Sequence, residues 1–307
     1  MGAQQGSLPL FPGMAAAASG MGLRLAGQAA ADGVFAEFSA ASGVGVARLA
    51  CAADDGELHR DRSWELAVVA TEFAAAEAYR AAGGKVAASL GFSIGAYAAP
   101  LCAGAVSIDQ VVTMIDIVLE ASLELEGRFA MLAVVGTSAQ ELEGLCRPGE
   151  AEVAAVLVSG QTLVADREGP VHDLEARVRA VALSVKELPV RRPLHTSPMK
   201  PVARELERRR AEVGELRPFR IPVYSALHGG RIEDPLEGWR LLVEHLFRPQ
   251  RFVRAFDAAQ GDGLVRCAEL GPGGTIERAV RWLGRPAVEV ETFPGEPDRG
   301  PRRKTRC

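Results

Sequence analysis

Short runs typical of β-strands alternate with longer runs of helical periodicity along this chain, and this alternation is typical of an α/β fold with a mainly parallel sheet. Residues 7–11 form the first strand candidate. Residues 63–82 repeat apolar side chains at helical spacing, and Gly83-Gly84 ends that helix because glycine tolerates the left-handed cap conformation. Residues 85–90 are short and apolar, as in a buried strand, and a second long helix is predicted over 108–125.

The texture of the sequence changes near Arg128. From here the predicted elements are a strand over 129–135, a helix over 138–146, a hairpin over 151–158 and 161–165, a helix over 171–181 and a strand over 183–188. This β-α-β-β-α-β order predicts an inserted ferredoxin-like subdomain over 128–194. The core then consists of 1–127 and 195–294, with further strands at 221–225, 264–270 and 287–290. The Pro-, Gly- and Arg-rich tail 295–307 is predicted to be disordered.

Composition excludes several classes of protein. Of 307 residues, 48% are hydrophobic, so a sizeable core is available, and a net charge of -4 gives no electrostatic reason for nucleic-acid binding. No apolar run approaches the roughly 20 residues that span a bilayer, and the N-terminus lacks a basic signal-peptide region. The five cysteines are scattered and form no CxxC pair, which argues against a zinc site and favours a reducing, cytoplasmic setting. We therefore expect a soluble, cytoplasmic protein without a metal.

Gly91-Phe92-Ser93-Ile94-Gly95 lies between the buried-strand candidate and a helical run that starts at Ala96. This strand-turn-helix context is the one a nucleophile elbow requires, because the two glycines permit a tight turn that exposes the serine hydroxyl. Free N–H groups at the start of the helix can stabilise the oxyanion that forms when a carbonyl is attacked. The pattern indicates Ser93 as a nucleophile, and a serine that only caps the helix is the alternative.

A serine nucleophile needs a base, and His195 is the best candidate among the five histidines. It lies at the junction between the predicted subdomain and a new helix, where a cleft between two domains would open. Taken alone, a histidine at such a junction is more often a capping residue. His59 and His172 lie in charged segments typical of the surface, His228 precedes two glycines of a turn, and His245 sits on an amphipathic helix.

Several segments match, in order, the motifs of one enzyme family. They are Leu10-Phe11-Pro12-Gly13-Met14 with Gly20-Met21-Gly22, the stretch 91–104, Val158-Ser159-Gly160-Gln161 with Leu163-Val164-Ala165, the stretch 195–203, and Glu269-Leu270-Gly271-Pro272-Gly273. On these residues the chain resembles the malonyl-CoA:acyl-carrier-protein transacylase family, which includes the acyltransferase domains of polyketide synthases. The resemblance covers residues 8–292.

The resemblance implies a fold and a catalytic arrangement. The fold is an α/β-hydrolase-like core with an inserted ferredoxin-like subdomain and the active site between them. Catalysis would use Ser93 with His195, the histidine being oriented by a backbone carbonyl, and the oxyanion would be bound by the backbone N–H groups of Met14 and Ile94. The implied partners are an acyl-carrier protein, a CoA thioester or both, with no nucleic acid, no membrane and no cofactor. We expect a monomer or a weak oligomer.

Departures from the family pattern concern the acyl pocket, which we assign to Phe92, Trp64, Val118 and Leu194. Phe92 replaces a histidine and Trp64 stands about where the family has a glutamine, so the pocket is less polar. Family members that use malonyl groups hold the carboxylate with an arginine 25 residues after the serine, and here that position is Val118. No Lys or Arg occurs between Lys85 and Arg128. An uncharged acyl group is therefore predicted, with an arginine supplied from elsewhere, such as Arg192, as the alternative.

The sequence thus predicts an acyltransferase that moves an uncharged acyl group to or from an acyl-carrier protein through an ester on Ser93, in polyketide or fatty-acid-type biosynthesis. An acyl-carrier-protein thioesterase that removes unwanted groups, or a non-catalytic relative that only binds the carrier, are the alternatives. Docking of an acidic carrier protein would need positive surface, and the candidates are Arg191, Arg192, Lys200, Arg204 and 208–210. A solvated helix face is the other interpretation of these charges.

Overall fold

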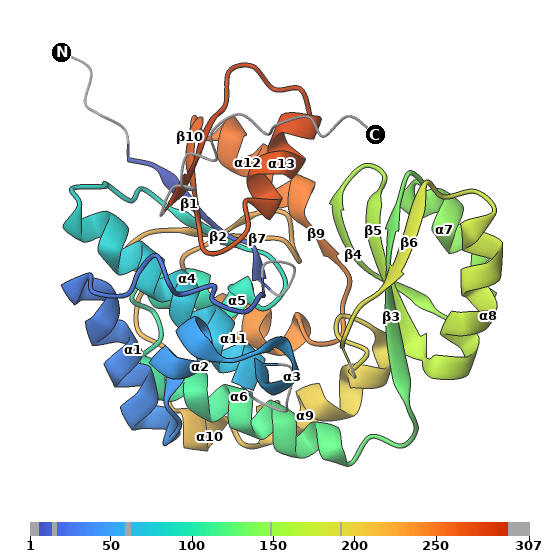
Figure 1. Cartoon of the computed structure of the whole chain (residues 1–307), viewed down its shortest axis with the longest axis horizontal. Helices are drawn as coiled ribbons and strands as arrows, with labels where there is room; N and C mark the ends of the chain where they lie inside the picture. Colours follow the sequence, from blue (N-terminus) through green and yellow to red (C-terminus); the bar gives the residue numbers. More distant parts are fainter. Residues whose placement is uncertain (1–5, 14–16, 59–62, 148, 191, 294–307) are drawn as a thin grey trace, which may run out of the picture.

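A mainly parallel sheet forms the centre of the larger domain. The computed structural model describes residues 6–13, 17–58, 63–147, 149–190 and 192–293. The strands of this sheet are β1 (Leu8–Phe11), β2 (Ser89–Gly91), β7 (Val223–Ser225), β8 (Arg231–Ile232), β10 (Arg266–Leu270) and β11 (Glu289–Phe293). Their order is β11-β10-β1-β2-β7-β8, and Figure 1 labels β10, β1, β2 and β7 of this sheet. Every pair is parallel except β7 with β8.

Helices cover both faces of this sheet. The helices whose buried side chains share a core cluster with Phe11 are α1 (Ala29–Ser42), α2 (Val46–Ala52), α3 (Asp55–Leu58), α4 (Ser63–Ala81), α5 (Gly95–Cys102), α6 (Ile108–Leu123), α9 (Lys200–Arg208), α10 (Arg210–Val213) and α11 (Pro235–Glu244). On the other side lie α12 (Phe252–Gly261) and α13 (Thr275–Trp282). Successive strand residues face opposite sides, so Leu10 packs with the α12 and α13 side chains whereas Phe11 packs with α4 and α5.

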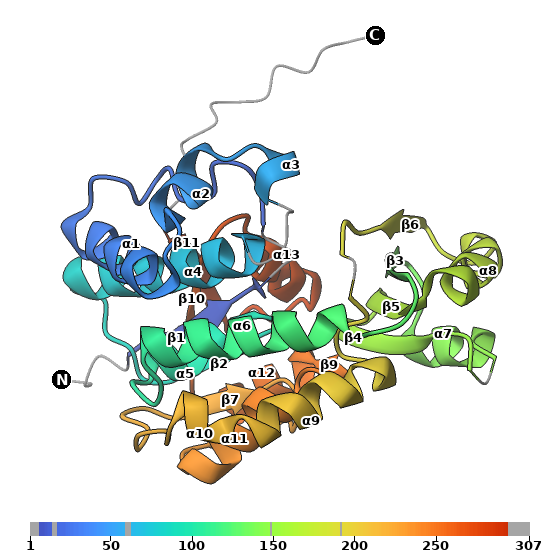
Figure 2. The same ribbon diagram turned by 90° about the horizontal axis from the view of Figure 1, so that it is seen from below.

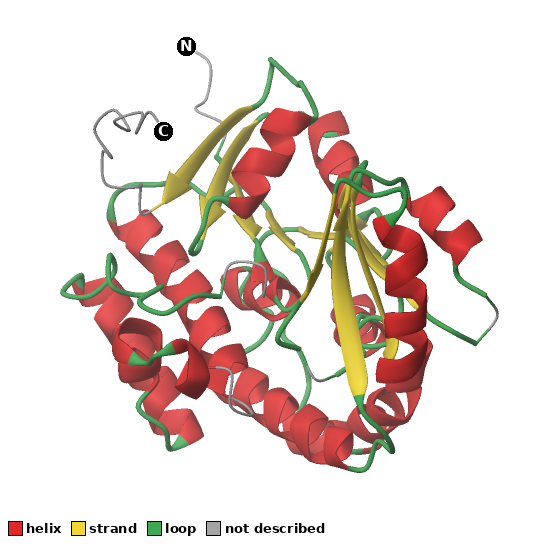
Figure 3. Cartoon of the chain, turned by 45° about the vertical axis from the view of Figure 1, so that its right-hand side comes forward, coloured by secondary structure: helices red, strands yellow, loops and turns green. Residues whose placement is uncertain are grey.

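The inserted domain is a second, mainly antiparallel sheet. Its elements are β3 (Phe129–Val135), α7 (Ala139–Leu145), β4 (Glu152–Val158), β5 (Gln161–Arg167), α8 (Glu168–Arg179) and β6 (Ser184–Glu187). The strand order is β6-β3-β5-β4-β9, where β9 (Gln250–Arg251) comes from the larger domain and pairs with β4 in parallel. Figure 3 shows the helices of this domain on the outer side of the sheet. Leu132, Val164 and Leu174 fill the layer between the sheet and these helices.

The predicted fold class is confirmed: an α/β-hydrolase-like core carries a ferredoxin-like subdomain. The β-α-β-β-α-β order of the subdomain follows the predicted elements, and α7 begins after the Ser138 capping box, in which Ser138 and Glu141 bond each other's backbone. Ser107 and Gln110 form the same box at the start of α6. The exact domain boundaries stay a prediction, and the tail 295–307 lies outside the described residues.

Several element boundaries differ from the sequence prediction. β2 spans only Ser89–Gly91 instead of 85–90, because Val86 makes no more than an isolated bridge to Ser7. α8 begins at Glu168, before the predicted 171, since Pro170 fits within the first turn of a helix. The two-residue strands β8 and β9 were not predicted, because two residues carry no periodicity. No helix in the described ranges is long and apolar enough to cross a membrane.

Candidate active site

Ser93 occupies a sharp turn between β2 and α5. Its backbone φ is 56°, in the left-handed region, where a residue other than glycine stores roughly 1–3 kcal/mol of strain. Ala96 N–H donates to the Ser93 carbonyl at 3.0 Å, which closes the turn into the helix. The predicted strand-turn-helix context of Ser93 is therefore present.

Both glycines of the motif are required by close backbone contacts. A Cβ on Gly91 would lie 2.1 Å from the carbonyl oxygen of Gly95, and a Cβ on Gly95 would lie 2.4 Å from the carbonyl oxygen of Phe11. No side chain fits at either distance, so the start of α5 rests directly on β1 and β2. This contact fixes where Ser93 emerges from the sheet.

His195 faces Ser93 from the segment that returns from the subdomain. Its Nε2 lies 3.0 Å from Ser93 Oγ, and its backbone N–H donates to the Leu246 carbonyl at 2.7 Å. The φ of His195 is 68°, and within the described part of the chain Ser93 and His195 are the only non-glycine residues with positive φ. Both are buried, with 4% and 2% of their surface exposed. The structure therefore brings together the two residues that the sequence predicted as a pair.

A backbone carbonyl, not an acid, orients the His195 ring. Its Nδ1 lies 2.5 Å from the carbonyl oxygen of His245, so the proton resides on Nδ1 and the Nε2 lone pair faces the Ser93 hydroxyl. Burial lowers the pKa of His195 to about 4, although the bond to the His245 carbonyl opposes this shift. The imidazole is therefore neutral near pH 7 and can accept a proton.

His245 directly follows α11 as its C-cap, and the sequence analysis placed it only on an amphipathic helix. Its own ring Nδ1 donates to the Leu242 carbonyl at 2.8 Å, and Tyr97 packs edge-to-face on the ring with centroids 5.1 Å apart. Burial, and then the neighbouring His195, lower its pKa to about 3. His245 thus contributes its backbone carbonyl to the site, while its neutral ring packs against Tyr97.

Gln250 is a site residue that the sequence analysis missed. Its Oε1 accepts the Ser93 backbone N–H at 2.9 Å, and its Nε2 lies 3.3 Å from His195 Nδ1. Gln250 is 157 positions away from Ser93, and it reaches the site because β9 pairs with the subdomain sheet. Nothing in its local sequence marks it, since Pro249-Gln250 belongs to no motif named above.

The two predicted oxyanion donors are only partly described. Met14 lies outside the described residues, whereas Ile94 N–H follows Ser93 and meets no acceptor within the described chain. The preceding Gly13 donates its N–H to Glu72 Oε1 at 2.6 Å, and a Cβ on Gly13 would lie 2.4 Å from the Phe92 carbonyl oxygen. Burial raises the pKa of Glu72 well above its ordinary value. The loop after β1 is therefore held directly against the Ser93 turn.

Three of the four predicted pocket residues share one apolar cluster. Trp64, Val118 and Leu194 are all buried and belong to the larger core cluster, together with Ile94. Phe92 is not brought together with them: it packs edge-to-face on Phe252, in the cluster beneath α12.

A buried ion pair lies beside this cluster. Arg192 is paired with Glu65, and the Arg192 guanidinium lies over the Trp64 ring at 5.8 Å. The sequence analysis named Arg192 as an alternative partner for a substrate carboxylate and as a candidate docking residue, and Glu65 was not predicted at all. Neither α5 nor α6 carries a Lys or Arg, since none occurs between Lys85 and Arg128.

Comparison with known proteins places this geometry in context. Residues 10–263 match the family model described as acyl transferase domain. The malonyl CoA-acyl carrier protein transacylase of Escherichia coli (strain K12) is 26% identical over 298 residues, which cover 91% of this chain and 94% of that relative.

Two solved structures share the fold at lower identity. The malonyl CoA-acyl carrier protein transacylase of Coxiella burnetii has a TM-score of 0.86 and 23% identity, covering 95% of this chain and 94% of that chain. A malonyl-transacylase in complex with a type II polyketide synthase acyl-carrier protein has a TM-score of 0.86 and 22% identity, covering 95% of this chain and 97% of that chain.

Gln250→Ala tests whether the distant glutamine positions Ser93. Removing the acceptor leaves the buried Ser93 N–H unpaired, so we expect covalent labelling of Ser93 by a serine-reactive probe to slow roughly 10- to 100-fold. The matched variant Gln161→Ala, on the subdomain hairpin, should label at the wild-type rate. Equal labelling rates for the two variants would contradict the role of Gln250.

The pH dependence of the same labelling reaction tests the state of His195. Its ordinary pKa is 6.5, whereas the folded value is about 4, so the neutral base should persist and labelling should fall only below about pH 5. A midpoint of the labelling profile near pH 6.5 would contradict the geometry.

The lowered pKa of His195 also means that the unfolded chain binds a proton that the folded chain does not bind, so stability should decrease as pH falls from 6.5 towards 4. Circular dichroism at each pH separates unfolding from protonation.

Proposed function

Since the chain belongs to the acyl transferase domain family, we propose that it moves an uncharged acyl group to or from an acyl-carrier protein through an ester on Ser93. The observation that carries the proposal is the 3.0 Å contact between Ser93 Oγ and His195 Nε2, formed by two residues held in strained backbone conformations. Such strain persists only where the surrounding structure enforces it, and it clusters at functional sites.

The first half-reaction forms the acyl-enzyme. His195 Nε2 accepts the Ser93 Oγ proton while Oγ attacks the thioester carbonyl. The backbone N–H groups of Ile94 and Met14 would donate hydrogen bonds to the negatively charged carbonyl oxygen. The C–S bond then breaks, and the thiolate takes the proton from the His195 imidazolium. The His245 carbonyl stabilises that imidazolium, because it accepts the Nδ1 hydrogen bond throughout.

The second half-reaction returns the acyl group to a thiol. His195 removes the proton of the incoming thiol, the sulfur attacks the Ser93 ester, and Ser93 Oγ regains its proton as the C–O bond breaks. We propose transfer in preference to hydrolysis because residues 10–263 match the acyl transferase domain family.

The preference for an uncharged group follows from the charges around the pocket. Val118, which stands where the family has its carboxylate-binding arginine, is buried and apolar, and Arg192 is already paired with Glu65. A buried carboxylate that lacks its own partner would cost about 3–5 kcal/mol. The relatives named above are malonyl enzymes. In this respect we propose that the present chain differs from them.

A carrier protein would meet the groove between α9 and α11. Of the predicted docking residues, Arg191 lies outside the described chain, Arg192 is mostly buried and pairs with Glu65, and each arginine of 208–210 pairs with a glutamate. Lys200 and Arg204 are exposed and form no ion pair within the described residues. Figure 2 shows α9 running beside both α6 and α11.

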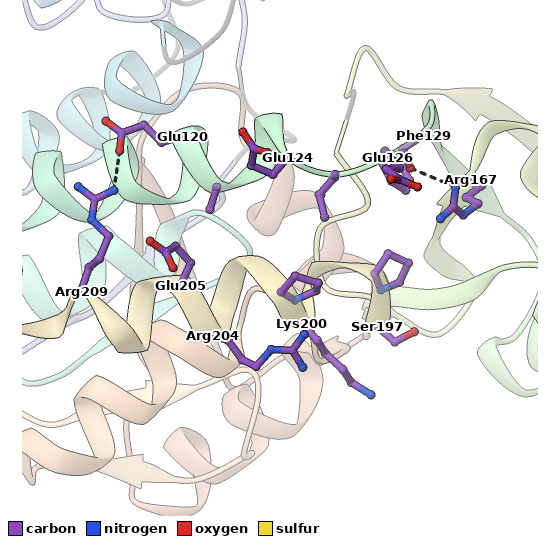
Figure 4. A pocket seen from close by; sticks show the side chains of 14 residues that line it. Glu120, Glu124, Glu126, Phe129, Arg167, Ser197, Lys200, Arg204, Glu205 and Arg209 are labelled. Carbon is purple, nitrogen blue, oxygen red and sulfur yellow. Dashed lines mark hydrogen bonds and ion pairs between the residues drawn. The ribbon is translucent and has the colours of Figure 1, made fainter.

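Lys200 and Arg204 line two cavities of different charge. In the cavity of about 770 Å³ between α6 and α9, the α6 side is acidic, with Glu120 and Glu124 (Figure 4). The cavity of about 500 Å³ between α9 and α11 adds Arg240 and apolar side chains. An acidic carrier protein fits the second cavity better, because Arg210 joins Lys200, Arg204 and Arg240 there and these outnumber Glu207 and Glu244.

Intact-protein mass spectrometry tests acyl transfer directly. After incubation with acetyl-, butyryl-, octanoyl- and malonyl-CoA, we expect an adduct from the uncharged donors, at least 100-fold less malonyl adduct, and none in Ser93→Ala. Added thiol should accelerate loss of the adduct, whereas loss that ignores thiol indicates a thioesterase. Malonyl labelling equal to that by the uncharged donors would contradict the proposed preference for uncharged groups. No adduct from any donor would favour a non-catalytic carrier-binding role.

Charge reversal at Lys200 tests the docking groove. Lys200→Glu should raise KM for the acyl-carrier protein roughly 5-fold and leave acylation by CoA thioesters unchanged, because only the protein substrate covers the groove. The matched reversal Lys186→Glu, on exposed β6, should change neither value. A KM that is equal in the two variants would rule out the α9–α11 groove as the docking site.

A further inference from the structure

Glu65 and Arg192 form a buried ion pair between distant parts of the chain. Glu65 lies in the first turn of α4, and Arg192 lies three residues before His195 on the segment that returns from the subdomain. Their side chains are 5% and 12% exposed. Charged side chains are almost never this buried unless they are paired, so each of them depends on the other.

The pair does not satisfy all of its own polar atoms. Glu65 Oε2 and Arg192 Nη1 are buried without a hydrogen-bond partner in the described chain, and so is the hydroxyl of Tyr97. The charge of Glu65 reaches Tyr97, because it adds to burial in raising the pKa of that hydroxyl. One edge of the Arg192 guanidinium therefore remains without an acceptor.

This group of residues adjoins the reaction centre. Tyr97 is four positions after Ser93, on α5, and its ring contacts the ring of His245, whose carbonyl holds His195. Trp64, beneath the Arg192 guanidinium, belongs to the same apolar cluster as Val118 and Leu194. The ion pair thus forms the polar part of the wall that we assign to the acyl pocket.

We propose that Glu65 is a specificity-determining residue: its carboxylate occupies the guanidinium of Arg192 in the place that a substrate carboxylate would otherwise take. This inference rests on the proposed acyl transfer through Ser93. A malonyl group would have to compete with an internal carboxylate that is already in contact. It would also meet repulsion from Glu65 and from Asp116, which is close enough for its charge to act on Glu65. An uncharged acyl group leaves the pair intact.

Glu65→Gln distinguishes competition by the Glu65 carboxylate for Arg192 from exclusion of malonyl by an apolar pocket alone. The substitution keeps the shape of the side chain and removes its charge, which frees Arg192 for a bidentate bond to a carboxylate. We expect the ratio of malonyl to butyryl adduct on Ser93 to rise at least ~10-fold over wild type. Adding Arg192→Gln to this variant should abolish the gain, because the cation is then missing.

Controls distinguish the possible outcomes. Glu120→Gln removes the carboxylate of another Arg–Glu pair, on α6, and should leave the ratio unchanged. Butyryl labelling in the same tube reports a folded site, and if Glu65→Gln does not fold, Glu65→Leu takes its place with the same expected gain. Normal butyryl labelling with no malonyl gain would overturn the inference and leave the acyl-enzyme intact. An absence of labelling in the wild type would instead overturn the proposed function.

Discussion

The hydrogen bond between Gln250 and the Ser93 backbone joins the parts of the molecule that must agree for the site to exist. Gln250 belongs to β9, whose backbone pairs with β4 of the subdomain, and the adjacent Arg251 N–H donates to the Ala226 carbonyl of the core. The same glutamine also touches the His195 ring. A shift of the subdomain relative to the core would therefore disturb both Ser93 and His195. The distance between these two side chains thus depends on how the two domains pack.

Burial explains how a dyad without an acid can work. An aspartate beside His195 would raise its pKa, whereas a carbonyl orients the ring and leaves burial as the dominant influence, so the imidazole stays neutral. The same low-polarity surroundings keep the nearby His245 neutral and raise the pKa of Glu72 beneath the loop after β1. The rings of His195 and His245 are thus uncharged in the resting state, and the surrounding backbone dipoles would stabilise the charges that form during acyl transfer.

The sequence predicts what is local and misses what is brought together by the fold. The Ser93 turn needs only two glycines, a strand and a helix within a short stretch, and the long helices α4 and α6 have clear periodicity. Gln250, the His245 carbonyl and the Glu65–Arg192 pair carry no such signal, because each acts on residues 50 or more positions away. A carbonyl is common to every residue, and a lone glutamine or glutamate on a helix is usually a surface residue.

The segment that carries an arginine determines which carboxylate lies beside it in the folded chain. An arginine at position 118 would approach the pocket from α6, the helix that also carries Asp109 and Asp116. Arg192 instead arrives on the connection from the subdomain, where the first turn of α4 supplies Glu65 as its partner. Because a buried guanidinium must be paired, the fold itself provides an anion for Arg192, although Arg192 Nη1 keeps no acceptor within the described chain. In the proposed device, discrimination against a carboxylate would come from Glu65 already paired with Arg192, in addition to the lack of an arginine on α6.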